Sequence, residues 1–227
     1  MADAHDVEGA EVELLAAERL TFFSDAVVAI AITLLALGLP VPWGATNAET
    51  LESVLDHGDD YVAFLISFGV IGSHWFAHHR TFRYVTRLTG PLARWNMLWL
   101  LTIIITPFAT RVVTSTGAFE IRFIFYATVQ ALAGVFSLLM IREIARSGVL
   151  RAVAPADLIG TFYQRVYVLI GVFVVSIPVA FVTRWAFLCW LAIPPLLRLQ
   201  NALTARRRSH RGLRQGFHRP SVFEFGA

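Results

Sequence analysis

Six long apolar stretches constrain this sequence more than any other feature. They cover residues 20–39, 61–77, 95–113, 123–141, 166–182 and 185–199. A helix of about 20 apolar residues crosses the roughly 30 Å hydrocarbon core of a bilayer. Only 15% of the 227 residues are charged, against about a quarter in an average soluble domain. The expected fold class is therefore all-α, a membrane protein with six transmembrane helices. The sixth stretch is the weakest, because Pro194 and Pro195 would break a helix interior.

The arginines fall mainly on one side of this six-span arrangement. The chain contains no lysine, and sixteen of its nineteen arginines lie on the side that holds both termini. Because short cytoplasmic loops carry an excess of basic residues, we expect a multi-pass protein of the cell membrane with both termini in the cytoplasm. The first connection between spans carries five acidic residues and faces outside. It is either a solvated loop or a surface that concentrates cations.

The two ends of the chain differ in charge from the apolar region between them. Residues 1–18 form an acidic cytoplasmic segment, residues 19–199 the six-helix transmembrane domain, and residues 200–227 an arginine-rich cytoplasmic tail. Membrane topology explains the arginines better than nucleic-acid binding does. The tail is expected to lie along anionic lipid headgroups or to be disordered. The expected partner is thus the lipid bilayer and not a nucleic acid.

The first apolar stretch contains a carboxylate that lipid cannot satisfy. Asp25 lies about 9 Å along the helix from Arg19. A lone charge at that depth costs at least a few kcal/mol unless it is paired or faces water. Ser24 and Arg19 are candidate partners on the same helix, although Arg19 can also reach across to a neighbouring helix. The other interpretation is an interfacial aspartate that only anchors the helix end.

An apolar stripe follows on the same helix. Ile30, Leu34 and Leu37 are spaced i, i+4 and i+7, which places them on one helical face. Thr33 lies near that face and offers a hydroxyl group. Most apolar stripes of membrane helices face lipid or other helices, so the spacing alone does not assign this stripe to a pore.

Two histidines of the second stretch, His74 and His78, have the i, i+4 spacing of helical zinc ligands. A metal site needs a third ligand, and neither an HExxH motif nor a nearby acidic pair supplies one. The second span runs from outside to inside, so both histidines lie at the level of Ser24 and Asp25. A network of carboxylate, hydroxyl, imidazole and indole groups is therefore favoured over a metal site, since lipid cannot satisfy these groups.

Three segments in the first half of the chain resemble one known family. They are RLTFFSDAVVAIAITLLALGL, SFGVIGSHWFAHHRTFRY and WNMLWLLTIIITPFAT. These segments are similar to bacterial members of the transmembrane protein 175 family, the relatives of the endosomal and lysosomal potassium channel. The most specific matches are Arg19, Phe23, Ser24, Asp25, Trp75, His78, His79, Phe82, Asn96, Pro107 and Phe108.

The resemblance implies a homotetramer of six-span subunits in which the first helix of each subunit lines a central pore. It implies a main constriction at Ile30, further apolar layers at Leu34 and Leu37, and a hydroxyl linked with potassium preference at Thr33. It also implies a structural and gating network made by Arg19, Phe23, Ser24, Asp25, His74, Trp75 and His78.

The function implied by the resemblance is a potassium-permeable, weakly selective cation channel with a hydrophobic constriction. Potassium, with other monovalent cations, is the expected permeant ion, and no cofactor, metal or catalytic residue is expected. The alternatives are a metal-dependent membrane enzyme and a proton-coupled transporter, either of which would use Asp25 with His74 and His78. The channel is favoured over both, mainly because of the family resemblance.

Overall fold

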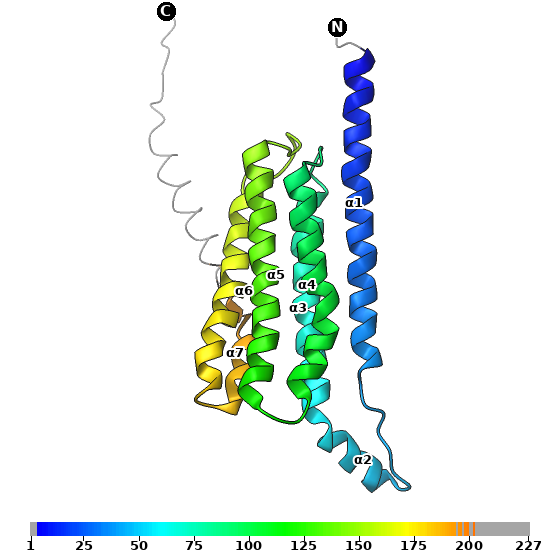
Figure 1. Cartoon of the computed structure of the whole chain (residues 1–227), viewed down its shortest axis with the longest axis vertical. Coiled ribbons are helices and arrows are strands. Elements are labelled where there is room, and N and C mark those ends of the chain that lie inside the picture. The colour runs from blue at the N-terminus through cyan, green and yellow to red at the C-terminus, as the bar shows by residue number, and fades with distance from the viewer. Residues whose placement is uncertain (1–3, 194, 197, 200–201, 203–227) are drawn as a thin grey trace, which may run out of the picture.

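Long helices running up and down beside one another form a bundle (Figure 1). This computed structural model describes residues 4–193, 195–196, 198–199 and 202, and these residues contain no β-strand. The all-α fold class predicted from the sequence is therefore confirmed. The helices are α1 (Ala4–Leu37), α2 (Asn47–Asp56), α3 (Gly58–Phe82), α4 (Gly90–Thr114), α5 (Phe119–Ser147), α6 (Leu158–Ala180), the 3-10 helix η1 (Arg184–Phe187) and α7 (Leu188–Leu191).

Five helices in the described part of the chain are long and apolar enough to cross a membrane. They are α1 from Glu11 to Leu37 and the whole of α3, α4, α5 and α6. Each overlaps one of the first five predicted stretches, which confirms a multi-pass membrane protein. The sixth stretch is not confirmed as a span: it begins with η1 and α7, and residues 194 and 197 lie outside the described residues. The arginine-rich tail also lies outside them, except for residue 202.

Helix α1 stands at one edge of the bundle and packs mainly against α3 and α4 (Figure 1). Its buried residues recur every three or four positions and so form one stripe along the helix. They are Ala17, Thr21, Ser24, Val28, Ala31 and Leu35. The N-terminal part of α1 continues beyond the ends of the neighbouring helices (Figure 1). The acidic segment, described from residue 4, thus belongs to the same continuous helix as the first span.

Two connections at the N-terminal end of the bundle are joined by backbone hydrogen bonds. Thr86 N–H donates to Val149 O and Arg151 N–H donates to Tyr84 O, both over 2.8 Å. These bonds tie the α3–α4 connection to the α5–α6 connection. The two connections therefore form one layer at this end of the molecule.

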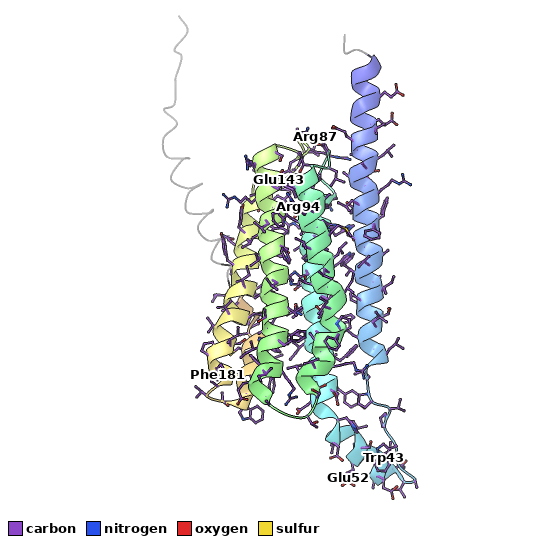
Figure 2. All side chains as sticks on the ribbon, viewed as in Figure 1. Trp43, Glu52, Arg87, Arg94, Glu143 and Phe181 are labelled. Carbon is purple, nitrogen blue, oxygen red and sulfur yellow. The ribbon has the colours of Figure 1, made fainter. Side chains whose placement is uncertain are left out.

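The basic and acidic connections lie at opposite ends of the bundle. Figure 2 places Arg87 and Arg94 at the end near the N-terminus, and Trp43 and Glu52 at the other end. The second of these ends holds α2. The residue before this helix, Thr46, caps it: the Thr46 side chain accepts a hydrogen bond from Glu49 N–H over 3.2 Å. This separation is the one that alternating spans predict.

The far side of the bundle from α1 is held by close packing of α5, α6 and α7. A Cβ atom added at Gly134 of α5 would clash with the Ile170 side chain of α6, so only glycine permits this approach. The Trp190 ring of α7 stacks on that of Tyr126, with 4.7 Å between centroids. Its indole N–H also donates to Ser176 Oγ over 2.9 Å, which fixes α7 against α6.

Candidate functional site

The predicted apolar stripe lies on the outward face of α1. Ile30, Leu34 and Leu37 are 58%, 44% and 82% exposed. Ile30 and Leu37 lie opposite the buried stripe of α1, and Leu34 lies to one side of them. The described chain leaves this face uncovered, so it is available to lipid or to other chains.

Thr33 shares this exposed face. Its hydroxyl group donates to the carbonyl oxygen of Ile30 over 2.8 Å. Because the hydroxyl hydrogen is used inside the helix, the remaining lone pairs of Thr33 Oγ1 stay free as acceptors. The residue can therefore present an oxygen acceptor to a cation on an otherwise apolar face.

A buried polar bridge joins α1, α4 and α3. Asn96 Nδ2 of α4 donates to Ser24 Oγ of α1 over 2.9 Å, and Asn96 Oδ1 lies 2.8 Å from His78 Nε2 of α3. Ser24 Oγ in turn donates to Leu20 O over 2.8 Å. Ser24 and Asn96 are fully buried and His78 almost so. We call these three residues, Ser24, Asn96 and His78, the polar bridge.

The hydrogen bonds of the polar bridge fix the His78 tautomer. The Ser24 hydroxyl hydrogen is used by Leu20 O, so Ser24 must accept from the Asn96 amide nitrogen. Asn96 Oδ1 is then an acceptor, and His78 Nε2 must carry the hydrogen. The His78 ring is also stacked between Phe82 and Trp99, at centroid distances of 3.9 and 4.6 Å. Hydrogen bonding and stacking together hold one orientation of the ring.

Asp25 is held by a separate pair of α3 side chains. Trp75 Nε1–H donates to Asp25 Oδ1 over 2.8 Å, and His79 Nδ1 lies 3.4 Å from Asp25 Oδ2. The Trp75 and His79 rings lie 5.4 Å apart, one helical turn from each other. The carboxylate predicted to need a partner at this depth therefore accepts one hydrogen bond, from Trp75, and has the His79 ring beside its other oxygen. Its role in this arrangement is to attach α1 to α3.

The sequence identified most of these groups but not the residues that link them. Four residues of the predicted network make interhelical hydrogen bonds: Ser24, Asp25, Trp75 and His78. Asn96 and His79 were not assigned a role in that network. Both residues were among the matches to the family, but the sequence assigned them no partner: Asn96 is a polar side chain near the start of an apolar stretch, and His79 is a histidine one turn after Trp75.

Three residues of the predicted network do not join it within the described part of the chain. Arg19 is exposed and forms no hydrogen bond or ion pair there, and Phe23 is also exposed. His74 is buried, its Nε2 atom has no hydrogen-bond partner, and its ring lies 6.4 Å from that of Trp99. Their predicted participation in the network stays a prediction.

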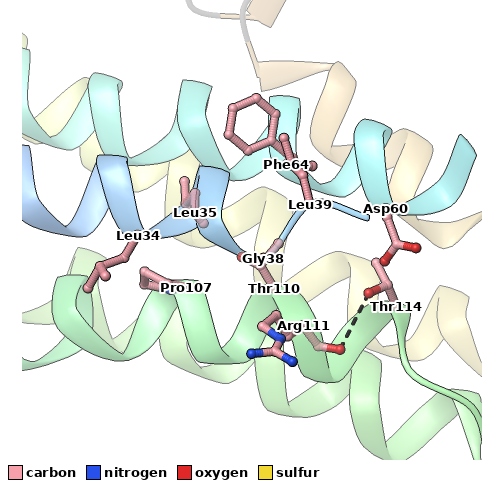
Figure 3. A pocket seen from close by; sticks show the side chains of 10 residues that line it. All are labelled: Leu34, Leu35, Gly38, Leu39, Asp60, Phe64, Pro107, Thr110, Arg111 and Thr114. Atoms are coloured by element: carbon pink, nitrogen blue, oxygen red, sulfur yellow. Dashed lines mark hydrogen bonds between the residues drawn. The ribbon is translucent and has the colours of Figure 1, made fainter. Parts of the chain in front are cut away.

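A small pocket lies between α1, α3 and α4 at the other end of the stripe (Figure 3). Leu34, Gly38, Phe64, Pro107 and Arg111 are among the residues that line it. A Cβ atom added at Gly38 would lie 3.3 Å from Arg111 Cδ, so a glycine here lets the end of α1 approach α4. Both ends of the exposed stripe are thus attached closely to the bundle.

Sequence comparison relates the first half of the chain to known channels. The sequence model of the endosomal/lysosomal potassium channel TMEM175 matches residues 19–107. A potassium channel of Chamaesiphon minutus is 40% identical over 94 residues, which are 40% of this chain and 46% of that protein. A potassium channel of Streptomyces collinus is 38% identical over 92 residues, 40% of this chain and 45% of that protein. The chain thus spans about half the length of these bacterial relatives.

Two further similarities extend this comparison. The endosomal/lysosomal proton channel TMEM175 of Gallus gallus is 38% identical over 96 residues, which are 39% of this chain and 19% of that protein. The crystal structure of a lysosomal potassium-selective channel TMEM175 homolog from Chamaesiphon minutus matches with a TM-score of 0.68 and 24% identity. That match covers 82% of this chain and 97% of the other, so the two share a fold over most of their lengths.

Proposed function

We propose that this chain, whose residues 19–107 match the sequence model of the TMEM175 family, is a member of that family and a subunit of a potassium-permeable, weakly selective cation channel. The family is one of ion channels, so it does not favour the membrane enzyme considered from the histidine spacing. Two similar bacterial proteins are named potassium channels. Because the matched segment is only part of each relative, the activity of the whole chain is part of this proposal.

The exposed stripe of α1 is the observation that carries the proposal. In a homotetramer with α1 at the centre, Ile30 and Leu37 of each copy would face the axis, while the buried stripe remains against α3 and α4. Lipid could also cover an apolar face. However, Thr33 shares this exposed face. Arg19 lies on it as well, one helical turn before Phe23. A face that mixes these polar groups with apolar ones suits a central pore better than the lipid boundary.

The proposed pore is closed by apolar side chains. Rings of Ile30, Leu34 and Leu37 would form a constriction that conducts only when it is wide enough to hydrate, which is gating by dewetting. Apolar rings cannot replace the hydration shell of an ion as carbonyl rings do, so selectivity would be weak. The free acceptor of Thr33 Oγ1, set by its bond to Ile30 O, supports a contribution of this residue to potassium preference.

The polar groups behind the stripe would hold the pore helix in position. The polar bridge and the Asp25 contacts attach α1 to α3 and α4 at the level of Ser24. We therefore assign Ser24, Asp25, Trp75 and His78 to a structural network coupled to gating, without direct ion coordination. The assignment of Arg19, Phe23 and His74 to this network remains part of the same proposal.

The distribution of charge supports an orientation in the membrane. Arg87 and Arg94 lie at the end of the bundle near the N-terminus, and the acidic α2 region lies at the other (Figure 2). The positive-inside rule would place the arginine end in the cytoplasm. Both termini are then cytoplasmic if the sixth stretch crosses the membrane, and α2 lies outside at the pore entrance.

Potassium flux into proteoliposomes tests this proposal. Ile30→Asn places a polar ring at the constriction, so we expect a flux at least several times that of the wild type. The matched control is Val175→Asn on α6, a residue that is 60% exposed and lies on a helix that forms no main contact with α1. This control should leave the flux unchanged, because a polar residue on the outer surface does not touch the pore.

The potassium flux of the two variants and the wild type distinguishes a wrong pore assignment from a wrong channel assignment. If Ile30→Asn and Val175→Asn change the flux equally, the stripe has no special place in conduction. If neither the wild type nor Ile30→Asn conducts potassium, the channel function itself is wrong. Proton flux measured in the same vesicles shows whether the chain also shares the activity named for the Gallus gallus relative.

A further inference from the structure

The N-terminal extension of α1, residues 8–19, carries exposed apolar residues outside the apolar stretch. Val12 and Leu15 are 62% and 51% exposed. Glu11, Glu13 and Glu18 lie on the same turns of helix, and such a density of carboxylates does not enter a hydrocarbon core. These carboxylates argue against a lipid environment for Val12 and Leu15, although the span-length helix begins at Glu11. Single exposed apolar residues are common on protein surfaces, so it is the alignment of these two with the stripe of α1 that points to a partner.

The exposed residues of this extension lie in line with the proposed pore stripe. Eighteen residues make about five turns of an α-helix. Val12 therefore lies on the same face as Ile30, Leu15 on the same face as Thr33, and Arg19 on the same face as Leu37. Because α1 is one continuous helix from Ala4 to Leu37, the face that would meet other copies in the membrane continues through the extension.

Contacts within the subunit turn the opposite face of the extension toward the bundle. Glu13 Oε2 lies 3.8 Å from Arg87 Nε, and Glu18 Oε1 lies 3.7 Å from Arg151 Nη2. Ala17 between them is buried. Exposed ion pairs of this kind are weak individually, but here they show which side of the helix meets the joined α3–α4 and α5–α6 connections. Val12 and Leu15 point away from their own subunit.

The sequence of the extension has the spacing of a coiled coil. Val12 and Arg19 occupy the a positions of a heptad repeat, Glu8 and Leu15 the d positions, and Glu11 and Glu18 the g positions. The g residue Glu18 directly precedes the basic a residue Arg19. In a parallel assembly Glu18, which already pairs with Arg151 of its own subunit, lies at the edge of the contact between helices, where its negative charge also favours Arg19 of the next copy.

We propose that the N-terminal extensions of the subunits associate with one another as a parallel coiled coil that continues the pore beyond the membrane. This inference rests on the proposed four-fold channel. Two heptads alone are too short to associate in water, but the transmembrane helices hold the copies close together and in register. Val12 and Leu15 then form a further apolar layer at the mouth, and Arg19 separates it from the layers in the membrane.

Disulfide cross-linking tests the association in the full-length protein. The single native cysteine is first replaced in Cys189→Ser, and Leu15→Cys, Leu14→Cys and Ile30→Cys are made separately in this background. Leu14 is the matched control, because it has the same side chain as Leu15 but lines the cleft with Glu13 and Arg87. After mild oxidation of membranes, we expect covalent dimers of Leu15→Cys and Ile30→Cys and almost none of Leu14→Cys.

The three cysteine positions separate this inference from the function on which it rests. Dimers of Ile30→Cys without dimers of Leu15→Cys overturn the coiled coil and leave the pore intact. Equal dimer yields for Leu14→Cys and Leu15→Cys also overturn it, because they show unspecific collision. Dimers at neither Leu15 nor Ile30 contradict both the coiled coil and the central position of α1.

Discussion

Replacement of Asn96 by leucine isolates the contribution of the polar bridge. Asn96 is fully buried and connects the pore helix to two other helices through its amide group. Leucine has a similar size and no polar atoms, so Asn96→Leu removes both side-chain hydrogen bonds without opening a large cavity. It leaves one hydrogen-bond donor, His78 Nε2–H, without its acceptor.

The expected loss of stability depends on the hydrogen bonds that Ser24 and His78 keep in the Asn96→Leu variant. The Ser24 hydroxyl keeps its bond to Leu20 O, so it loses little. His78 loses the acceptor of its Nε2–H, while its Nδ1 atom already has no partner. A buried donor left unsatisfied costs about 1–3 kcal/mol, and single interhelical hydrogen bonds in membranes contribute about 0.6 and at most about 1.7 kcal/mol. We expect Asn96→Leu to destabilise the protein by about 1–2 kcal/mol.

Thermal loss of the monodisperse protein in detergent measures this effect. For a chain of this size about 1 kcal/mol corresponds to about 2–4 °C in the midpoint, so a decrease of about 2–8 °C is expected. The double variant Asn96→Leu with His78→Phe removes the stranded donor and keeps a ring between Phe82 and Trp99. Since loss of both partners is nearly neutral, it should recover most of the midpoint.

Gln130→Leu is the control for Asn96→Leu. Gln130→Leu removes another fully buried amide, but its Nε2 donates only to Thr106 Oγ1 and its Oε1 has no partner. It should shift the midpoint less than Asn96→Leu. If the double variant is as unstable as the sum of its two single variants, the unsatisfied donor is not the cause and our account of the polar bridge is refuted.

Three further predictions test other parts of the structure. Asp25→Ala should lower the yield of assembled protein, measured by size-exclusion chromatography, and leave the ion preference of the remaining channels unchanged. Normal assembly with an altered ion preference would indicate that the carboxylate coordinates ions. Thr33→Val should lower the potassium-to-sodium flux ratio whereas Thr33→Ser should preserve it, and equal ratios in both would exclude a hydroxyl contribution. Gly134→Ala should destabilise the protein by about 1–3 kcal/mol because its Cβ clashes with Ile170. In contrast, Gly160→Ala, where a Cβ meets no atom, should be neutral or stabilising by up to about 1 kcal/mol in thermal melts.

The residue types needed for the polar contacts could be recognised from the sequence, but their pairing could not. Ser24 and Asp25 are neighbours in sequence, yet successive side chains of an α-helix point about 100° apart. Ser24 therefore meets α4 while Asp25 meets α3. The same rotation separates His78, which bonds to Asn96, from His79, which meets Asp25. Spacing along one helix does not give its rotation relative to a neighbour, and the role of Asn96 depends on that rotation.

The face of α1 that packs within the subunit was equally hard to predict. In a soluble protein the most apolar face is buried, but the buried stripe of α1 includes Ala17, Thr21 and Ser24, while Phe22 and Ile30 are exposed. Lipid solvates apolar side chains as well as a protein interior does, so hydrophobicity does not select the packed face in a membrane. The first five predicted stretches therefore overlap the five long helices, but hydrophobicity did not determine how each helix is rotated about its axis.

The two faces of α1 make the stability and the conduction of the proposed channel depend on the same contacts. Ser24 and Ile30 lie on different faces of one helix, six residues apart, so rotation about the helix axis moves both together. The polar bridge fixes that rotation on the Ser24 side, and thereby determines whether Ile30 points to the axis of the assembly. Loss of the bridge should therefore change potassium flux even though Asn96 is fully buried and lines no pore. A variant that lowers the melting midpoint through Asn96 but leaves the flux unchanged would show that other copies of α1, and not the contacts within the subunit, set the orientation of Ile30.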